Sequence, residues 1–339
     1  MIDISEIDEN GLEDILSEPA EATKKIVAGL TGDIAVLGAG GKMGPTLAMM
    51  LKKASPGRKI YAVSRFSDKA ARSRIEQAQV ETIEADLLDE SHYYKLPDVE
   101  NVFYLAGMKF GSTGNQPLTW ALNSFVPALV ARHYKHSRIV AYSTGNVYPL
   151  VDIAGGGATE QTTPKPIGEY AQSCLGRERV FGYFAERHST GVCVIRLNYA
   201  VEARYGVLLD IARRVFGGEP VQVGMGRVNL IWQGDANSAI FRSLALAGAP
   251  AQVLNVTGME ILSVRTLAEE LGRRLGRRPR CEGTESETAL LSDASLCRRL
   301  LGLPRVPLGW LLDLVADWVI AGRPTYAKPT KFEVRDGRF

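Results

Sequence analysis

The sequence DIAVLGAGGKMG, residues 33 to 44, joins a short apolar run to a glycine-rich turn, and a helical segment follows it. Its glycines are spaced GxxGxxG, which lets the backbone turn sharply and lets a phosphate approach the start of the helix. Free N–H groups and the dipole at a helix N-terminus favour an anion there. The stretch therefore predicts the first strand, turn and helix of a dinucleotide-binding unit. The candidate phosphate-binding residues are Gly38, Gly41, Lys42, Met43 and Gly44.

Short β-branched runs alternate with helical segments from this stretch onward to residue 195. Strands that are separated by helices pair in parallel through right-handed crossovers. We therefore predict an α/β fold with a doubly wound, Rossmann-like parallel sheet, whose ligand site lies at the carboxyl ends of the strands. After the first strand at residues 33–37, the predicted strands are 59–63, 80–84, 101–105, 137–142 and 191–195.

The chain divides into three parts on this pattern. Residues 1–32 are an acidic extension with helical spacing of apolar residues, interrupted by Pro19. Residues 33–197 form the predicted dinucleotide-binding domain. Residues 198–339 form a smaller substrate-binding lobe and a tail, and this lobe includes a brief strand at 251–257 and a helix at 263–275.

Charge and composition limit the classes of partner. The formal net charge of +2 comes from 40 basic and 38 acidic residues, so no overall field favours nucleic acid or an anionic membrane. Four cysteines form no CxxC pair and no metal-ligand spacing, so we expect no metal. The start of the chain lacks the basic and apolar regions of a signal peptide, and no run is long and apolar enough to span a bilayer. We expect a cytoplasmic protein that binds a small molecule.

Two strand ends predict how the coenzyme is recognised. The second strand normally ends in an acidic residue that binds the ribose 2′-hydroxyl of NAD, whereas a basic residue accommodates the 2′-phosphate of NADP. Here the strand ends with Ser64 and Arg65, which favours NADP, with NAD as the alternative if Arg65 only stacks over the adenine. Asp86 and Leu87, at the end of the third strand, are placed to meet the adenine.

Taken together, the motifs resemble the extended short-chain dehydrogenase/reductase family, also called the NAD-dependent epimerase/dehydratase family. The likeness covers about residues 33 to 320 and rests on motifs in the same order along the chain. These are the glycine loop, Asp86 and Leu87, the sequence LAG at 105–107, Asn123, the sequence YSTGNVY at 142–148, and Tyr170 in a helix that normally reads YxxxK.

The resemblance implies a role for each matching residue. Thr144 hydrogen-bonds the reacting hydroxyl or carbonyl, and Tyr170 exchanges its proton while hydride moves to or from the nicotinamide. The resemblance also implies a homodimer, formed through the helices that carry Asn123 and Tyr170. The further coenzyme contacts that it implies are Ala106, Gly107, Asn123, Cys174 and Asn198.

Cys174 stands where the family has the lysine that holds the nicotinamide ribose and lowers the pKa of the tyrosine. A thiol supplies no positive charge, so three alternatives remain open. In the first, another cation takes the place of the lysine, and Lys109 is better placed for this than Lys165. In the second, Tyr170 acts only as a neutral acid. In the third, the chain is catalytically silent and serves as an NADP-binding sensor or scaffold.

The substrate side is less specific. The resemblance suggests a carbohydrate derivative, namely a sugar, a sugar acid or a nucleotide sugar, and the loop at 110–115 offers polar groups to a polyol. Arg227 is a candidate for binding a diphosphate or a carboxylate. We expect an NAD(P)-dependent oxidoreductase or epimerase that acts at a secondary alcohol or ketone. The candidate substrate-binding residues are Lys109, Asn146, Tyr199 and Arg227.

Overall fold

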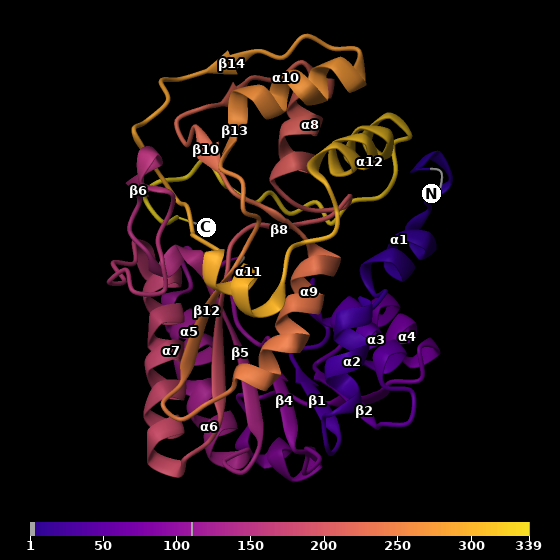
Figure 1. Ribbon diagram of the computed structural model, residues 1–339, viewed down its shortest axis with the longest axis vertical. Coiled ribbons are helices and arrows are strands. Elements are labelled where there is room, and N and C mark those ends of the chain that lie inside the picture. Colours follow the sequence, from indigo (N-terminus) through magenta and orange to yellow (C-terminus); the bar gives the residue numbers. More distant parts are fainter. Residues whose placement is uncertain (1–3, 110, 339) are drawn as a thin grey trace.

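A seven-stranded parallel sheet forms the centre of the computed structural model, which describes residues 4–109 and 111–338 (Figure 1). The strand order is β12-β7-β5-β4-β1-β2-β3, and every neighbouring pair is parallel. This order confirms the predicted doubly wound α/β fold. The strands are β1 (Ile34–Leu37), β2 (Ile60–Ser64), β3 (Glu81–Glu84), β4 (Asn101–Tyr104), β5 (Arg138–Thr144), β7 (Val192–Leu197) and β12 (Gln252–Val256).

Helices cover both faces of the sheet because alternate strand residues point to opposite faces. Val36 on β1 packs with residues of α3 (Gly44–Ala54) and α9 (Gln233–Arg242) on one face. Leu37 packs with residues of α6 (Val126–His133) and α7 (Gly168–His188) on the other. The remaining helical elements around the sheet are α4 (Lys69–Gln77), η2 (Glu90–Lys95), α5 (Gln116–Trp120), η3 (Ala121–Phe125), η4 (Gly145–Val147), η5 (Ile153–Gly155), η6 (Ser243–Leu246) and α11 (Ser295–Leu301).

One strand departs from the expected division of the chain. The sequence places residues 251–257 in the smaller lobe, but β12 lies within this range and forms an edge of the main sheet, paired with β7. Leu254 and Val256 are buried in the same core as α3 and α9, and this apolar contact holds the strand there.

A smaller lobe lies beyond the carboxyl ends of the strands (Figure 1). Its core forms where α8 (Val207–Gly217) packs against α10 (Val264–Leu275) and α12 (Leu308–Ile320). Short strands connect these helices and join the lobe to the sheet. They are β6 (Val151–Asp152), β8 (Ala200–Val201), β9 (Val221–Gln222), β10 (Arg227–Val228), β11 (Ile231–Trp232), β13 (Leu262–Ser263), β14 (Cys281–Glu282) and β15 (Thr288–Ala289).

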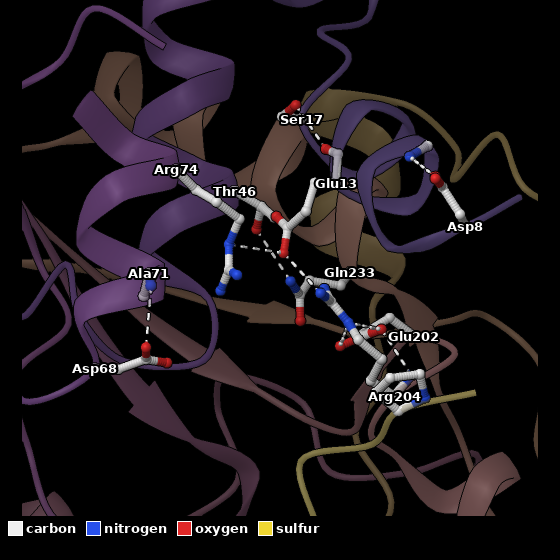
Figure 2. Close-up of polar contacts among 12 residues, drawn as sticks. Asp8, Glu13, Ser17, Thr46, Asp68, Ala71, Arg74, Glu202, Arg204 and Gln233 are labelled. Atoms are coloured by element: carbon white, nitrogen blue, oxygen red, sulfur yellow. Dashed lines mark hydrogen bonds and ion pairs between the residues drawn. The ribbon is translucent and has the colours of Figure 1, made fainter. Parts of the chain in front are cut away.

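The first described residues, 4–28, form what we call the N-terminal segment: η1 (Ile4–Glu6), α1 (Glu9–Leu16) and α2 (Glu21–Ala28). Glu13 of α1 is buried, and its carboxylate lies 2.7 Å from the Arg204 guanidinium and 3.7 Å from that of Arg74 (Figure 2). Arg204 also pairs with Glu202 at 3.2 Å. The segment therefore neutralises a buried arginine that belongs to the loop after β8.

Residues 323–338 form what we call the C-terminal tail, which runs between the two lobes. The Thr330 N–H and hydroxyl both donate to Asp210 of α8, at 2.7 and 2.5 Å. Arg335 donates to the Thr288 carbonyl at 2.7 Å. Gly337 then lies against Gly168 at the start of α7, so close that a side chain on either glycine would overlap the other's backbone. The tail thus connects the smaller lobe to the helix that carries Tyr170.

Among the described residues, no helix combines the length and the apolar character that a membrane span requires.

Candidate functional site

The glycine-rich turn has the geometry that a dinucleotide requires. Gly38 has a φ of 87°, and a Cβ there would lie 2.6 Å from the Ala106 backbone nitrogen; a Cβ on Gly44 would lie 2.3 Å from the Ala39 carbonyl oxygen. Only glycine permits these approaches. No side chain among the described residues caps α3, so its first N–H groups remain directed at the turn. Uncapped N–H groups fit a pyrophosphate.

The predicted coenzyme-recognising residues lie at the ends of β2 and β3. Ser64 faces the glycine turn, because a Cβ built on Gly40 would lie 2.7 Å from its hydroxyl oxygen. Arg65 is exposed beside it. The Asp86 carboxylate accepts from the Leu88 N–H at 3.0 Å, and Leu87 is buried. These contacts hold the strand ends in shape, and the adenine contacts of these residues remain a prediction.

Thr144 and Tyr170, predicted from the motifs, lie together in the structure. Both line a cavity of about 160 Å³ between the sheet and the smaller lobe, and a hydrogen bond joins their side chains. The Thr144 hydroxyl oxygen also accepts from the Asn146 amide at 2.9 Å. A polarising hydroxyl and a phenol therefore face one space that a reacting carbon can enter.

The pKa of the Tyr170 phenol is raised well above its ordinary value of 10, mainly by burial and secondly by Cys174. Two effects act in the opposite direction: the nearby Arg177 guanidinium and the hydrogen bond with Thr144. The pKa of the Cys174 thiol is also raised, chiefly by burial. Cys174 is therefore a neutral group beside the phenol and supplies none of the charge that a lysine would supply.

Arg177 is a residue near the site that the sequence motifs do not indicate. It lies one turn beyond Cys174 on α7, is buried, and donates to the Tyr142 carbonyl at 2.8 Å and to the Asn123 side-chain oxygen at 2.7 Å. A side chain on Gly107 would lie 2.2 Å from this guanidinium, so the glycine leaves it room. Its spacing of seven residues from Tyr170, on the same helix face, was the available signal.

Asn123 connects these elements and lies in the π-helical turn η3. Its amide donates to the Met108 carbonyl at 3.0 Å and to the Ser173 hydroxyl at 2.9 Å, and its oxygen accepts from the Met108 N–H at 2.8 Å. All of these contacts are internal to the chain. Asn123 therefore positions the loop after β4 against α7, and its predicted contact with the coenzyme remains a prediction.

Two buried lysines line the same cavity. The Lys42 ammonium donates to the Ala200 carbonyl at 2.9 Å and lies 4.1 Å from the centre of the Tyr205 ring. Burial lowers its pKa to about 7, against the opposing charge of Glu202. Lys109 lies 3.5 Å from the Thr330 carbonyl, and burial lowers its pKa to about 8. Lys165 is exposed and does not line this cavity.

The remaining predicted residues separate into two groups. Asn198 and Tyr199 line the cavity with Asn146, and the Asn198 amide donates to Asn229 at 3.0 Å. Arg227 does not line it and donates instead to Glu285 at 2.7 Å. Of the loop at 110–115, Phe110 lies outside the described residues. The structure thus brings most of the predicted site together but not Arg227.

Comparisons with solved structures agree with this architecture. MoeE5 in complex with UDP-glucose and NAD shares 21% sequence identity and a TM-score of 0.71, over 86% of this chain and 99% of that one. UDP-glucuronic acid 4-epimerase from Bacillus cereus in complex with NAD shares 19% identity and a TM-score of 0.73, over 85% and 99%. UDP-glucose 4-epimerase from Thermotoga maritima shares 19% identity and a TM-score of 0.72, over 86% and 99%.

The chain thus shares the fold of these three proteins, and this agrees with the doubly wound sheet that its motifs indicate. No protein-family model matches the sequence, and no curated protein matches it.

Proposed function

We propose that the protein is an NAD(P)-dependent oxidoreductase or epimerase that acts at a secondary alcohol or ketone of a carbohydrate derivative. The observation that carries the proposal is the hydrogen-bonded pair of Thr144 and Tyr170, which faces a cavity beside a glycine turn suited to a pyrophosphate. The fold shared with MoeE5 and with UDP-glucuronic acid 4-epimerase, both solved with NAD, supports it.

Each residue of the pair has a role that its position allows. The Thr144 hydroxyl donates to the oxygen of the reacting carbon and fixes its orientation. Tyr170 gives a proton to that oxygen when a ketone is reduced and takes one when an alcohol is oxidised. A bound nicotinamide coenzyme would supply the hydride acceptor or donor. Because burial raises the pKa of Tyr170, its neutral form dominates, and this is the form that can donate a proton to the oxygen of a ketone.

The function is tested by substitution of Tyr170. Tyr170→Phe keeps the ring and removes the proton, so it should lower kcat by about 100-fold or more, whereas coenzyme affinity should change little. The measurement is the change in reduced-coenzyme absorbance over a panel of sugars, sugar acids and nucleotide sugars. If neither the wild type nor this variant turned over any compound of the panel, the proposal would be contradicted.

The missing lysine is replaced, in this proposal, by two cations: Lys109 in the cavity and Arg177 behind Cys174. Both charges oppose the rise in the pKa of the Cys174 thiol, and the charge of Arg177 also opposes the rise in the pKa of the Tyr170 phenol. Lys109→Met should therefore lower turnover or coenzyme affinity by about tenfold, and Cys174→Lys should restore part of the loss. If Lys109→Met changes neither quantity, the replacement idea is wrong.

NADP is the coenzyme that this chain's own residues favour, because Ser64 and the exposed Arg65 stand where an acidic residue would bind the ribose of NAD. The solved neighbours named above with a coenzyme hold NAD. Titration with both coenzymes decides between them, and Arg65→Asp should reverse a preference for NADP.

A second candidate is a catalytically silent protein of the same fold that binds the coenzyme as a sensor or scaffold. The neutral thiol at Cys174 and the raised pKa of Tyr170 favour it. This candidate predicts tight coenzyme binding with no turnover in any variant, including Cys174→Lys.

We further propose that two copies of the chain pair through the helices around α7. Leu118, Phe125 and Tyr183 are exposed apolar side chains on α5, η3 and α7. Exposed apolar side chains on neighbouring helices are typical of an interface. Phe125→Glu should convert a dimer to a monomer in light scattering.

A further inference from the structure

The C-terminal tail is bound to the smaller lobe where it passes the cavity beside Tyr170. Thr330 lines the cavity and donates twice to Asp210 of α8. Phe332 is buried in the core of the smaller lobe, and Glu333 pairs with Arg214 at 2.8 Å. Burial of an aromatic ring together with several polar contacts holds this part of the tail against the lobe. The tail is therefore a built wall of the cavity.

The next residues of the tail cross to the dinucleotide-binding domain. The Arg335 guanidinium donates to the Thr288 carbonyl at 2.7 Å and to the Thr288 hydroxyl at 2.6 Å. A Cβ built on Gly337 would lie 2.3 Å from the Ile167 carbonyl oxygen, so the two backbones touch just before α7 begins. Tyr170 lies in the first turn of that helix. The tail thus closes the gap between the two lobes next to Tyr170.

The size of the closed cavity limits the molecule that enters it. Its volume is about 160 Å³, which is below the range of roughly 300–1,000 Å³ that is common for pockets of larger ligands. A nucleotide sugar carries a nucleoside and a diphosphate in addition to its sugar. The cavity therefore leaves room for one sugar-sized unit beside the pair of Thr144 and Tyr170, and not for the nucleotide.

The candidate group for binding a diphosphate is paired with a carboxylate of the chain. Glu285 accepts from Arg227 at 2.7 Å and from Arg265 at 2.9 Å, and Arg227 does not line the cavity. The tail contacts the same segment, because the Arg335 guanidinium lies 3.5 Å from the Gly224 carbonyl oxygen. A diphosphate that bound Arg227 would have to compete with Glu285 beside the tail.

We propose that the C-terminal tail is a specificity element: it closes the substrate cavity, so that the protein acts on a free sugar or sugar acid and excludes nucleotide sugars. This inference rests on the proposed function and narrows its substrate class. Thr330 forms the wall that the substrate meets, while Arg335 and Gly337 keep the wall in place.

Binding to the wild-type protein tests the inference without requiring turnover. The probes are D-glucose, D-galactose, D-glucuronate and D-galacturonate, each compared with its own UDP derivative. They are titrated calorimetrically into the protein saturated with whichever of NAD and NADP it binds. We expect the free compound that binds best to bind at least about tenfold more tightly than its UDP derivative.

Arg335→Ala releases the tail from β15 and should open the cavity. The ratio of the affinity for the free compound to that for its UDP derivative should then fall by about tenfold. The matched control is Arg338→Ala, which removes an exposed arginine of the same tail whose ion pair is with Asp336, and it should leave the ratio unchanged. A variant that was merely destabilised would weaken both ligands together and leave the ratio as it was.

Gly337→Ala displaces the tail in a second way, because its methyl group would overlap the Ile167 carbonyl. It should lower the same ratio. The matched control is Gly322→Ala: Gly322 also has a positive φ, 61° against 74° for Gly337, but a Cβ there would meet open space. Both variants carry the strain of alanine in the left-handed region, and only Gly337→Ala moves the tail.

Three outcomes would overturn the inference. A UDP derivative binds the wild type as tightly as its free compound; no free compound of the panel binds; or neither Arg335→Ala nor Gly337→Ala lowers the ratio. Failure of the proposed function looks different, because the wild type would then bind a free compound, exclude its UDP derivative and still turn over neither.

Discussion

The N-terminal segment and the C-terminal tail both reach Arg204, but they contact it in different ways. Glu13 of the segment gives it a buried ion pair at 2.7 Å. Tyr326 of the tail places its ring 4.9 Å from the guanidinium and donates its N–H to the Arg204 carbonyl at 3.2 Å. Figure 2 shows the first contact, with Glu13 between Arg74 and Arg204.

The two ends also differ in their distance from the chemistry. The segment contributes no residue to the cavity lining, whereas the tail contributes Thr330. A buried charge must be neutralised wherever it lies, while a cavity wall must be shaped where the ligand binds. The segment therefore contributes mainly to neutralising a buried charge, and the tail contributes to the wall of the cavity.

We expect the largest loss of stability when the ion pair between Glu13 and Arg204 is broken. Glu13→Gln leaves Arg204 with Glu202 as its remaining carboxylate partner, so the free energy of unfolding should fall by about 3 kcal/mol. The measurement is urea unfolding followed by circular dichroism. The control is Asp14→Asn, which removes an exposed ion pair with Lys53 and should cost less than about 1 kcal/mol. Equal losses in the two variants would contradict the assignment.

A smaller effect on the free energy of unfolding concerns Lys42, whose ammonium contacts the Ala200 carbonyl and the Tyr205 ring. Folding lowers its pKa from 10.5 to about 7, so between these values the unfolded chain carries a proton that the folded chain has lost. The free energy of unfolding should therefore rise with pH above about 7, by at most about 1.4 kcal/mol per pH unit. The comparison is with Lys42→Met, whose free energy of unfolding should change less with pH. The same pH dependence in both proteins would contradict the lowered pKa of Lys42.

The smallest effect on stability comes from the tail. Thr330→Val removes the hydroxyl hydrogen bond to Asp210 and keeps the backbone one, which should cost about 1 kcal/mol. Because Thr330 lines the cavity, KM should rise severalfold while coenzyme affinity stays the same. Thr325→Val, which removes a longer hydrogen bond of 3.5 Å from Arg213, is the matched control. A stability loss without any change in KM would give the tail the same role as the segment.

Much of the fold could be predicted because local patterns determine it. The glycine turn and the apolar runs depend on residues close in sequence or on strand ends that parallel pairing brings together. The pair of Thr144 and Tyr170 was predicted from the family resemblance. Strand β12 was placed in the smaller lobe because its neighbours in sequence are there, and only long-range packing against β7 reveals its sheet.

The residues of the site were harder to predict from the sequence, because their contacts are also long-range. Arg177 fits beside the site because Gly107 leaves space for its guanidinium and the Asn123 side-chain oxygen accepts a hydrogen bond from it. Arg227 was a candidate for an anion, but Glu285 pairs with it from a distant loop. Thr330 reaches the cavity from the tail, which carries no motif. Contacts of this kind require the folded chain.

The meeting of both ends at Arg204 has a consequence for synthesis on the ribosome. The loop that holds Arg204 also forms a wall of the cavity, through Tyr205. Its two supports are far apart in the sequence, so Glu13 and Arg204 are both synthesised well before Tyr326. A nascent chain that has already formed its sheet therefore cannot yet present a finished binding pocket.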